Sequence, residues 1–256
     1  MTPARHRHPY LDHPTPIPFA HRGGTADGIE NTAAAFRRAA GLGYRYFETD
    51  VHATADGRLV AFHDATLDRV TDGRGRIAEL TWDEVSRARV GGREPLPLFE
   101  DLLDEFPEAR WNVDIKAAPA LEPLIGLIRR TGAWDRVCVG SFSEARVRAA
   151  ARLAGPRLAT SYGVRGVLGL RLRSYRLPFP VRWGAVCAQV PVEQHGIRVV
   201  DRRFVRMAHA RGLQVHVWTI NDPERMAALL DLGVDGIMTD HLETLRTVFT
   251  ERGAWY

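Results

Sequence analysis

Apolar residues recur along the chain in two alternating patterns. Short apolar runs are typical of buried strands, and apolar residues spaced three or four apart are typical of helices with one buried face. The predicted strands are 19–22, 46–51, 111–116, 137–142, 157–162, 185–190, 214–220 and 236–239. The predicted helices are 31–40, 98–106, 121–131, 144–153, 202–211, 223–232 and 242–251. Strands that alternate with helices over about 250 residues favour a closed (β/α)8 TIM barrel over an open sheet.

Two stretches interrupt this alternation. Residues 59–97 contain a short apolar strand, turns rich in glycine and arginine, and a small helix predicted over 82–88. This stretch is too long for a simple loop, so we expect an insertion at about 65–97 on the catalytic face, after the second βα unit. Residues 165–182, where arginines alternate with apolar residues, fit neither pattern clearly. We expect an N-terminal arm over residues 1–16 and a barrel over 17–256.

Composition narrows the class of protein. Hydrophobic residues make up 45% of the chain and charged residues 26%, as in ordinary globular domains. No apolar run approaches the ~20 residues of a membrane span, and no apolar leader opens the chain, so we expect a cytoplasmic location. Cys138 and Cys187 lie in apolar runs and are predicted to be buried thiols. The net charge of +4 comes without a nucleic-acid reader motif, so we expect no nucleic-acid partner.

Two histidines follow predicted strands, where the catalytic groups of such barrels lie. His21 and Arg22, followed by two glycines, end the first strand, and His63 follows the apolar residues 59–62. Histidine can move protons near neutral pH, and arginine can hold a phosphate through two parallel hydrogen bonds. Two proton carriers would allow one to activate a nucleophile and the other to protonate a leaving oxygen.

Acidic residues end two further strands. Glu48 and Asp50 lie two positions apart, so their side chains point to one face of their strand. Close carboxylates repel unless a cation neutralises them, and Mg²⁺ or Ca²⁺ takes such oxygen ligands. Asp114 would be a third carboxylate for this metal. The alternative is a carboxylate pair at the barrel rim that water solvates.

Lys116 is the one lysine among 35 basic residues. A compact ammonium kept beside a carboxylate indicates a crowded phosphate pocket, since a guanidinium is a wide planar fork. Trp218 near the end of the seventh strand could form an apolar wall for the substrate or could pack in the core. Gln189 ends another strand and could donate a hydrogen bond to the substrate.

These motifs, in this order, resemble the glycerophosphodiester phosphodiesterase family over roughly residues 17–248. The matching motifs are His-Arg-Gly-Gly at 21–24, Glu-Asn-Thr at 30–32, Glu-x-Asp at 48–50, His-Asp at 63–64, 67–73, 218–221 and 233–240.

The resemblance implies that Glu48 and Asp50 bind a divalent cation, Mg²⁺ or Ca²⁺, and that His21 and His63 form the acid–base pair. It also implies that Arg22 and Lys116 contact phosphate. The family usually has glutamate where this chain has Asp114, a shorter arm that could alter ion preference. The expected reaction converts glycerophosphodiesters to glycerol 3-phosphate and an alcohol.

Two alternatives stay open at this point. Residues 165–182 combine arginines with apolar side chains, as segments at anionic membrane surfaces do, so the enzyme could act on lysophospholipids while peripherally bound at the inner membrane face. Some relatives in the family use such substrates. The other alternative is a barrel without catalytic activity that binds phosphorylated ligands.

Overall fold

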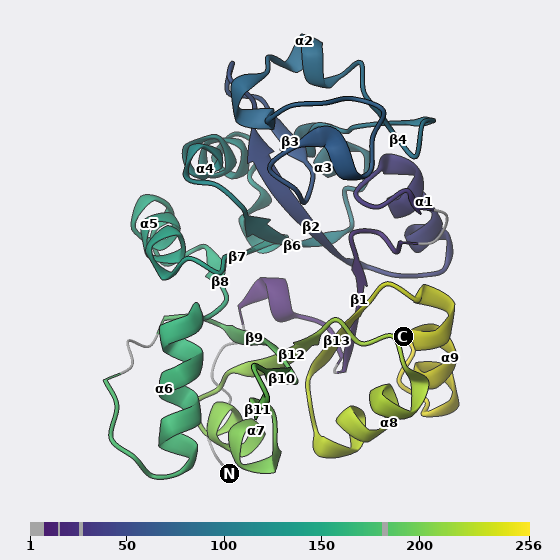
Figure 1. Ribbon diagram of the computed structural model, residues 1–256. Helices are drawn as coiled ribbons and strands as arrows, with labels where there is room; N and C mark the ends of the chain where they lie inside the picture. Colours follow the sequence, from purple (N-terminus) through teal and green to yellow (C-terminus); the bar gives the residue numbers. More distant parts are fainter. Residues whose placement is uncertain (1–7, 15, 26–27, 181–183) are drawn as a thin grey trace.

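A parallel barrel is the core of the molecule (Figure 1). The computed structural model describes residues 8–14, 16–25, 28–180 and 184–256. The barrel strands are β1 (Ile17–His21), β2 (Tyr46–Ala53), β6 (Arg110–Ile115), β7 (Val137–Gly140), β8 (Ala159–Thr160), β9 (Cys187–Pro191), β12 (Gln214–Trp218) and β13 (Gly236–Thr239). Their order is β8-β7-β6-β2-β1-β13-β12-β9, and a parallel bridge between Ser161 and Cys187 joins the two ends. The predicted (β/α)8 barrel is confirmed.

Helices surround the strands (Figure 1). They are α1 (Ala33–Gly41), α3 (Phe99–Glu105), α4 (Leu121–Thr131), α5 (Glu144–Ala154), α6 (Val164–Ser174), α7 (Arg202–His209), α8 (Pro223–Leu232) and α9 (Leu242–Glu251). The sequence pattern did not predict α6. Gly166, Gly169 and Leu170 form its buried face, whereas Val164 and Leu168 are exposed. Apolar side chains therefore lie on both sides of α6, so the one-sided pattern of an ordinary surface helix is missing.

The N-terminal end of the barrel is closed by an apolar cluster. Tyr10, in a short 3-10 helix over Pro9–Leu11, is fully buried, and the Tyr46 hydroxyl donates a hydrogen bond to its carbonyl oxygen at 2.5 Å. Cys138 and Cys187 are buried free thiols in the same cluster, as expected. The described part of the expected arm, from residue 8 onward, therefore packs against the barrel.

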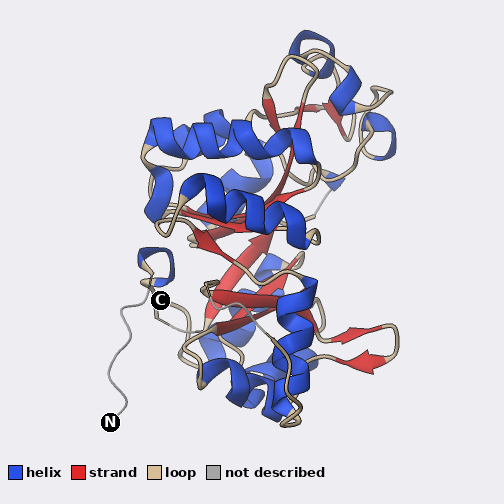
Figure 2. Ribbon diagram, turned by 90° about the vertical axis from the view of Figure 1, so that its left-hand side faces the viewer, coloured by secondary structure: helices blue, strands red, loops and turns tan. Residues whose placement is uncertain are grey.

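Two excursions project on the opposite, catalytic side of the barrel, at the right of Figure 2. The first contains β3 (Leu59–Ala61), antiparallel to β2, then α2 (Trp82–Val85), β4 (Arg89–Val90) and β5 (Glu94–Pro95). Its apolar side chains form a cluster of their own around Phe62, Ile77 and Val85. The helix predicted over 82–88 is a single turn. The second excursion is the hairpin of β10 (Glu193–Gln194) and β11 (Ile197–Arg198), which was not predicted.

Gly236 in β13 has no room for a side chain. A Cβ atom there would lie 2.8 Å from Phe19 Cε2 and 2.9 Å from His216 Cδ2. We expect Gly236→Ala to lower the free energy of unfolding by about 1–3 kcal/mol, as overpacking a core does.

Chemical denaturation of the purified variant would measure this change. Gly126→Ala is the matched control, because a Cβ atom on Gly126, in α4, would lie 3.8 Å from the nearest atom, Arg130 Nη1. That variant should gain roughly 0.5–1 kcal/mol, since alanine favours a helix over glycine. Equal stability changes in the two variants would contradict the close packing at Gly236.

Candidate active site

A left-handed turn after β1 places the first functional groups. Arg22, Gly23 and Gly24 have φ values of 53°, 77° and 86°. A Cβ atom on Gly23 would lie 2.9 Å from the Cβ of Ala35, so glycine allows this turn to pack on α1. The Arg22 backbone N–H donates to the Glu48 carbonyl at 3.0 Å, which ties the turn to β2. Arginine in such a conformation is the kind of strain that structures retain at functional sites.

His21 is held by an aspartate from the far end of the chain. Its Nδ1 lies 2.6 Å from Asp240 Oδ1, and Asn221 donates to the other oxygen of Asp240 at 2.9 Å. Burial alone would lower the pKa of His21, but Glu48 and Asp240 outweigh it and raise the pKa above its ordinary value. The Nε2 of His21, 3.6 Å from Glu48 Oε2, is on the ring edge turned away from Asp240.

His63 has a matching arrangement. Its Nδ1 lies 2.6 Å from Asp64 Oδ1, and its backbone carbonyl is 3.2 Å from Nε2 of the buried His52. Both His21 and His63 line one pocket. An aspartate at Nδ1 fixes the tautomer of each imidazole and leaves Nε2 for a substrate.

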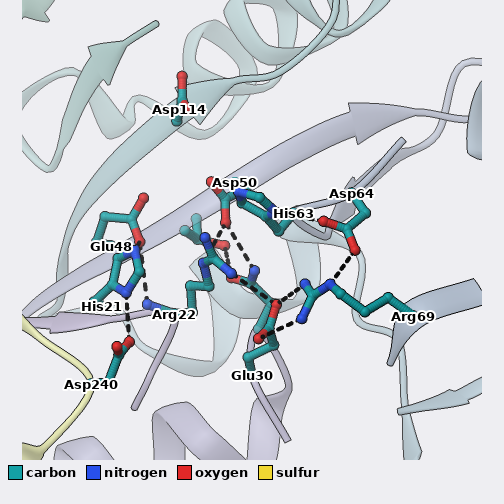
Figure 3. Close-up of polar contacts among 12 residues, drawn as sticks. His21, Arg22, Glu30, Glu48, Asp50, His63, Asp64, Arg69, Asp114 and Asp240 are labelled. Carbon is teal, nitrogen blue, oxygen red and sulfur yellow. Dashed lines mark hydrogen bonds and ion pairs between the residues drawn. The ribbon is translucent and has the colours of Figure 1, made fainter. Parts of the chain in front are cut away.

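A chain of ion pairs links His63 to Arg22 (Figure 3). Arg69, from the inserted segment, pairs with Asp64 through Nε and with Glu30 through Nη2, the latter at 2.7 Å. Glu30 also accepts from Arg22 Nη1 at 3.0 Å. Arg69 therefore restrains the partner of a histidine and the partner of a predicted phosphate ligand at the same time.

The three predicted metal ligands line the same pocket but do not converge on one point. Asp50 and Asp114 are neighbours across β2 and β6, and the Lys116 ammonium lies between them, at 2.8 Å from Asp50 and 2.7 Å from Asp114. Arg22 Nε is 3.2 Å from Asp50, and in Figure 3 Asp114 stands apart from Glu48. Within the described ranges, no group of three or more histidine, cysteine or acidic side chains is arranged to hold a metal ion. Lys116 and Arg22 occupy the role expected of the cation.

The chemistry of these oxygens nevertheless fits a hard divalent cation. Burial, with Asp50 beside it, raises the pKa of Glu48 to about 7, and burial also raises the pKa of Asp114. Asp114 Oδ1 is buried with no hydrogen-bond partner among the described residues. Raised pKa values and an unpaired carboxylate oxygen both indicate too little positive charge at this place, which a divalent cation would supply.

The pocket has a volume of about 510 Å³ and two unlike walls. Gln189 lines it and donates to Asn112 Oδ1 at 2.7 Å, so its amide nitrogen is already engaged. Trp218 lies on the pocket wall with its ring 5.5 Å from the ring of Phe142, edge to face. Helix α6 and the β10–β11 hairpin add apolar side chains to the lining, namely Val164, Val167, Leu168 and Ile197, together with the polar side chains of Arg171, Gln194 and His195.

Comparison with known proteins decides the family. The model of the glycerophosphoryl diester phosphodiesterase family matches residues 21–244, which span every one of the site residues described above. The chain belongs to this family. The expected glycerophosphodiester phosphodiesterase, a phosphoric diester hydrolase, is thereby confirmed as the class of enzyme.

Members and relatives of the family resemble the chain over nearly its whole length. A probable glycerophosphodiester phosphodiesterase 2 of Mycobacterium tuberculosis is 42% identical, covering 96% of this chain and 95% of the relative. A human lysophospholipase D is 29% identical, covering 89% and 84%. Among solved structures, a glycerophosphoryl diester phosphodiesterase from Silicibacter pomeroyi aligns with a TM-score of 0.81 at 23% identity, covering 95% and 97%. A phosphodiesterase from Oleispira antarctica, in complex with sn-glycerol-3-phosphate, aligns with a TM-score of 0.76 at 21% identity, covering 92% and 97%.

The structure adds residues to the site that sequence reasoning left without a role. Asp240 lies in one of the family motifs, but nothing local in the sequence pairs it with His21, 219 positions away. Asn31, with φ 58°, donates to Asp50 at 3.1 Å and accepts from Thr49. Asp64 is different, because it directly follows His63 and was expected from the sequence either to orient that ring or to cap the next turn; in the structure it lies 2.6 Å from His63 Nδ1.

Arg69 provides a test of how this family member positions His63. We expect Arg69→Ala to lower kcat roughly tenfold to a hundredfold, since small displacements of catalytic groups have effects of this size. Arg69→Lys should restore little, because one ammonium cannot replace a guanidinium that pairs with both Asp64 and Glu30. Steady-state kinetics over a range of pH would measure both kcat and its pH dependence, which should change together.

Arg76→Ala is the control for Arg69→Ala. Arg76 lies in the same inserted segment, and its ion pair among the described residues is with the exposed Glu79, at 3.4 Å. The activity of Arg76→Ala should stay close to that of the wild type. If Arg69→Ala and Arg76→Ala had the same kinetics, Arg69 would have no positioning role.

Proposed function

We propose that this enzyme is a metal-dependent phosphodiesterase that converts glycerophosphodiesters to glycerol 3-phosphate and an alcohol by acid–base catalysis with two histidines. One observation carries the proposal. Two imidazoles, His21 and His63, each held at Nδ1 by an aspartate, line one pocket with the basic side chains Arg22 and Lys116. This set can move two protons and hold a phosphate between them.

We assign the proton transfers to the Nε2 atoms, because each Nδ1 is engaged by an aspartate. One imidazole removes the proton from the attacking hydroxyl as its oxygen forms a bond to phosphorus. The other, protonated, gives its proton to the alcohol oxygen as the second phosphorus–oxygen bond breaks. The resemblance to the family suggests the glycerol 2-hydroxyl as the first nucleophile, which would leave a cyclic phosphate for water to open. Arg22 and Lys116 offset the charge that develops on the phosphate oxygens.

Glu48, Asp50 and Asp114 are the residues that would hold Mg²⁺ or Ca²⁺. Such a cation would supply positive charge to the phosphate oxygens when bound. Lys116 now neutralises both Asp50 and Asp114, so it would be released toward the phosphate when these carboxylates have another partner. Gln189 and Trp218, on the pocket wall, would contact the substrate beyond the phosphate.

The histidine assignment predicts large losses of activity. We expect His21→Ala and His63→Ala each to lower turnover of glycerophosphocholine by about 100-fold or more, the size expected for losing a general acid or base. His209→Ala is the control, because His209 lies on α7, pairs with Asp235 and is not among the residues that line the pocket. Release of glycerol 3-phosphate would measure all three. Near-normal turnover in both His21→Ala and His63→Ala would contradict the assignment of these histidines as general acid and base.

The raised pKa of Glu48 predicts pH-dependent cation binding. With a pKa of about 7, this carboxyl holds a proton at lower pH that a cation must displace. Binding should therefore weaken and release more protons as the pH falls through about 7, and Glu48→Gln should lose this dependence. Calorimetric titration of metal-stripped protein with Mg²⁺ and with Ca²⁺, in buffers of different ionisation enthalpy, would measure it.

Chelation provides the activity arm of the same test. A chelator should abolish hydrolysis, and addition of the preferred ion should restore it. Hydrolysis that survives exhaustive chelation, together with no heat of binding for either ion, would argue against a metal mechanism.

A second substrate class has an observation in its favour. The apolar wall of Val164, Val167 and Leu168 could accept a hydrocarbon chain, and one relative named above is a lysophospholipase D. Assays with glycerophosphocholine and lysophosphatidylcholine, each with Mg²⁺ and Ca²⁺, would separate the two substrate classes. A barrel without catalytic activity would bind these compounds and leave both intact.

A further inference from the structure

An unusual set of exposed apolar side chains surrounds the mouth of the active-site pocket. Ile197 is 66% exposed, Val164 58%, Phe142 56% and Leu168 47%, and all four line the pocket. They come from three separate segments: the end of β7, helix α6 and the β10–β11 hairpin. We call these four residues the apolar rim. Exposed apolar residues that gather at one site indicate an interaction surface, whereas scattered ones do not.

Helix α6, which carries two of the four rim residues, is held in place. Val164 and Leu168 lie one turn apart on α6, whose opposite face is buried through Gly166 and Leu170. Arg171 of α6 pairs with Asp201 at the N-terminus of α7, at 2.8 Å. Figure 2 shows the hairpin that carries Ile197 projecting from the catalytic side of the barrel. Val164 and Leu168 are therefore presented outward on a fixed support, and burying them inward would require α6 to move.

The charge beside the rim is positive. Residues 163–180 contain four arginines, Arg165, Arg171, Arg173 and Arg176. They contain neither aspartate nor glutamate. Arg165 and Arg176 are exposed. Anionic lipid surfaces attract such basic segments, and apolar side chains next to them enter the interface between headgroups and acyl chains. A second copy of this chain is a poor occupant, because a symmetric contact would bring two positive segments together.

The rim is also continuous with the residues that would hold the substrate phosphate. The Phe142 ring lies 5.9 Å from the Lys116 ammonium and edge-on to Trp218. A surface seated on the rim would thus meet the open mouth of the pocket, with lipid headgroups facing the basic side chains. No helix among the described residues is long and apolar enough to span a bilayer.

We propose that the apolar rim, with Arg165 and Arg176, docks the enzyme on an anionic lipid bilayer. This docking goes beyond the proposed function, because it requires no hydrolysis. It also gives the expected membrane contact of residues 165–182 a defined surface, in which Phe142 and Ile197 lie outside that segment. Residues 181 and 182 of that segment lie outside the described residues.

Vesicle flotation of the full chain tests the docking without any assay of activity. We expect the protein to float with vesicles of phosphatidylcholine mixed with phosphatidylglycerol, and far less with phosphatidylcholine alone. The bound fraction should fall as salt is raised, because the attraction of exposed arginines to lipid is screened. A wild-type protein that floats with neither vesicle would overturn the proposal.

A double variant of the rim and a control variant of an exposed leucine elsewhere separate a specific surface from nonspecific adsorption. Leu168→Gln combined with Ile197→Gln should weaken vesicle binding by about tenfold or more, the scale of losing the burial of large apolar side chains. Leu153→Gln is the control, since Leu153 is also a helical leucine, 46% exposed, on α5 outside the pocket lining. Thermal unfolding of each variant would verify its fold. Equal losses in the rim variant and in Leu153→Gln would overturn the proposal.

The arginines have their own pair of variants. Arg165→Gln and Arg176→Gln should each weaken binding to the anionic vesicles by roughly fivefold, and Arg152→Gln on α5 should have little effect. Light scattering measures the oligomeric state and so tests whether a second copy of the chain covers the rim. If the wild type formed dimers that the rim substitutions dissociate, a second copy would cover the rim and the lipid proposal would be wrong.

Discussion

The buried carboxylate of Asp50 is the group on which the rest of the site depends. Its residue is 1% exposed, and Lys116 and Arg22 lie 2.8 Å and 3.2 Å from its oxygens. Burial alone would raise the pKa of Asp50, but the two cations lower it below the ordinary value. A buried charge of this kind is tolerated only with such partners, and removing one partner costs far more than the pair contributes. Because β1 and β6 both pair with β2, Asp50 draws together side chains that follow its two neighbouring strands.

This constraint explains why a chain so rich in arginine has a lysine at position 116. The ammonium fits between Asp50 and Asp114, which are direct neighbours across two strands, and bonds to both. A guanidinium is wider and flat, so it suits the more open place of Arg69 between Asp64 and Glu30. The negative charge at this place is nevertheless only partly neutralised. Lys116 leaves Asp114 Oδ1 without a partner, and Glu48 keeps its raised pKa.

Sequence reasoning located the parts of the site that lie on or directly after strands. A period of two along β2 put Glu48 and Asp50 on one face, and short apolar runs found the barrel strands within a few residues. It could not find contacts set by closure of the barrel, such as His21 with Asp240, because β1 and β13 become neighbours only when the sheet closes. Nor could it find α6, whose buried face is made of glycine and whose exposed face is apolar. The expected metal set of three carboxylates stays a prediction, and pattern alone did not show that Lys116 reaches both Asp50 and Asp114.

The side chains of the catalytic face therefore fall into two halves, according to the strands and connections that carry them. The predicted proton carriers, phosphate ligands and carboxylates form the first half and lie on or directly after β1, β2, β3, β6 and β13, where strand pairing and buried charge leave each side chain little freedom. The second, apolar half comes from the connections after β7, β8 and β9, where Phe142, Val164 and Ile197 line the pocket and are largely exposed. Substitutions in the first half disturb buried ion pairs and hence the fold of the site. Substitutions in the second half change only what the pocket mouth presents, so chemistry and the choice of partner can vary separately on one barrel.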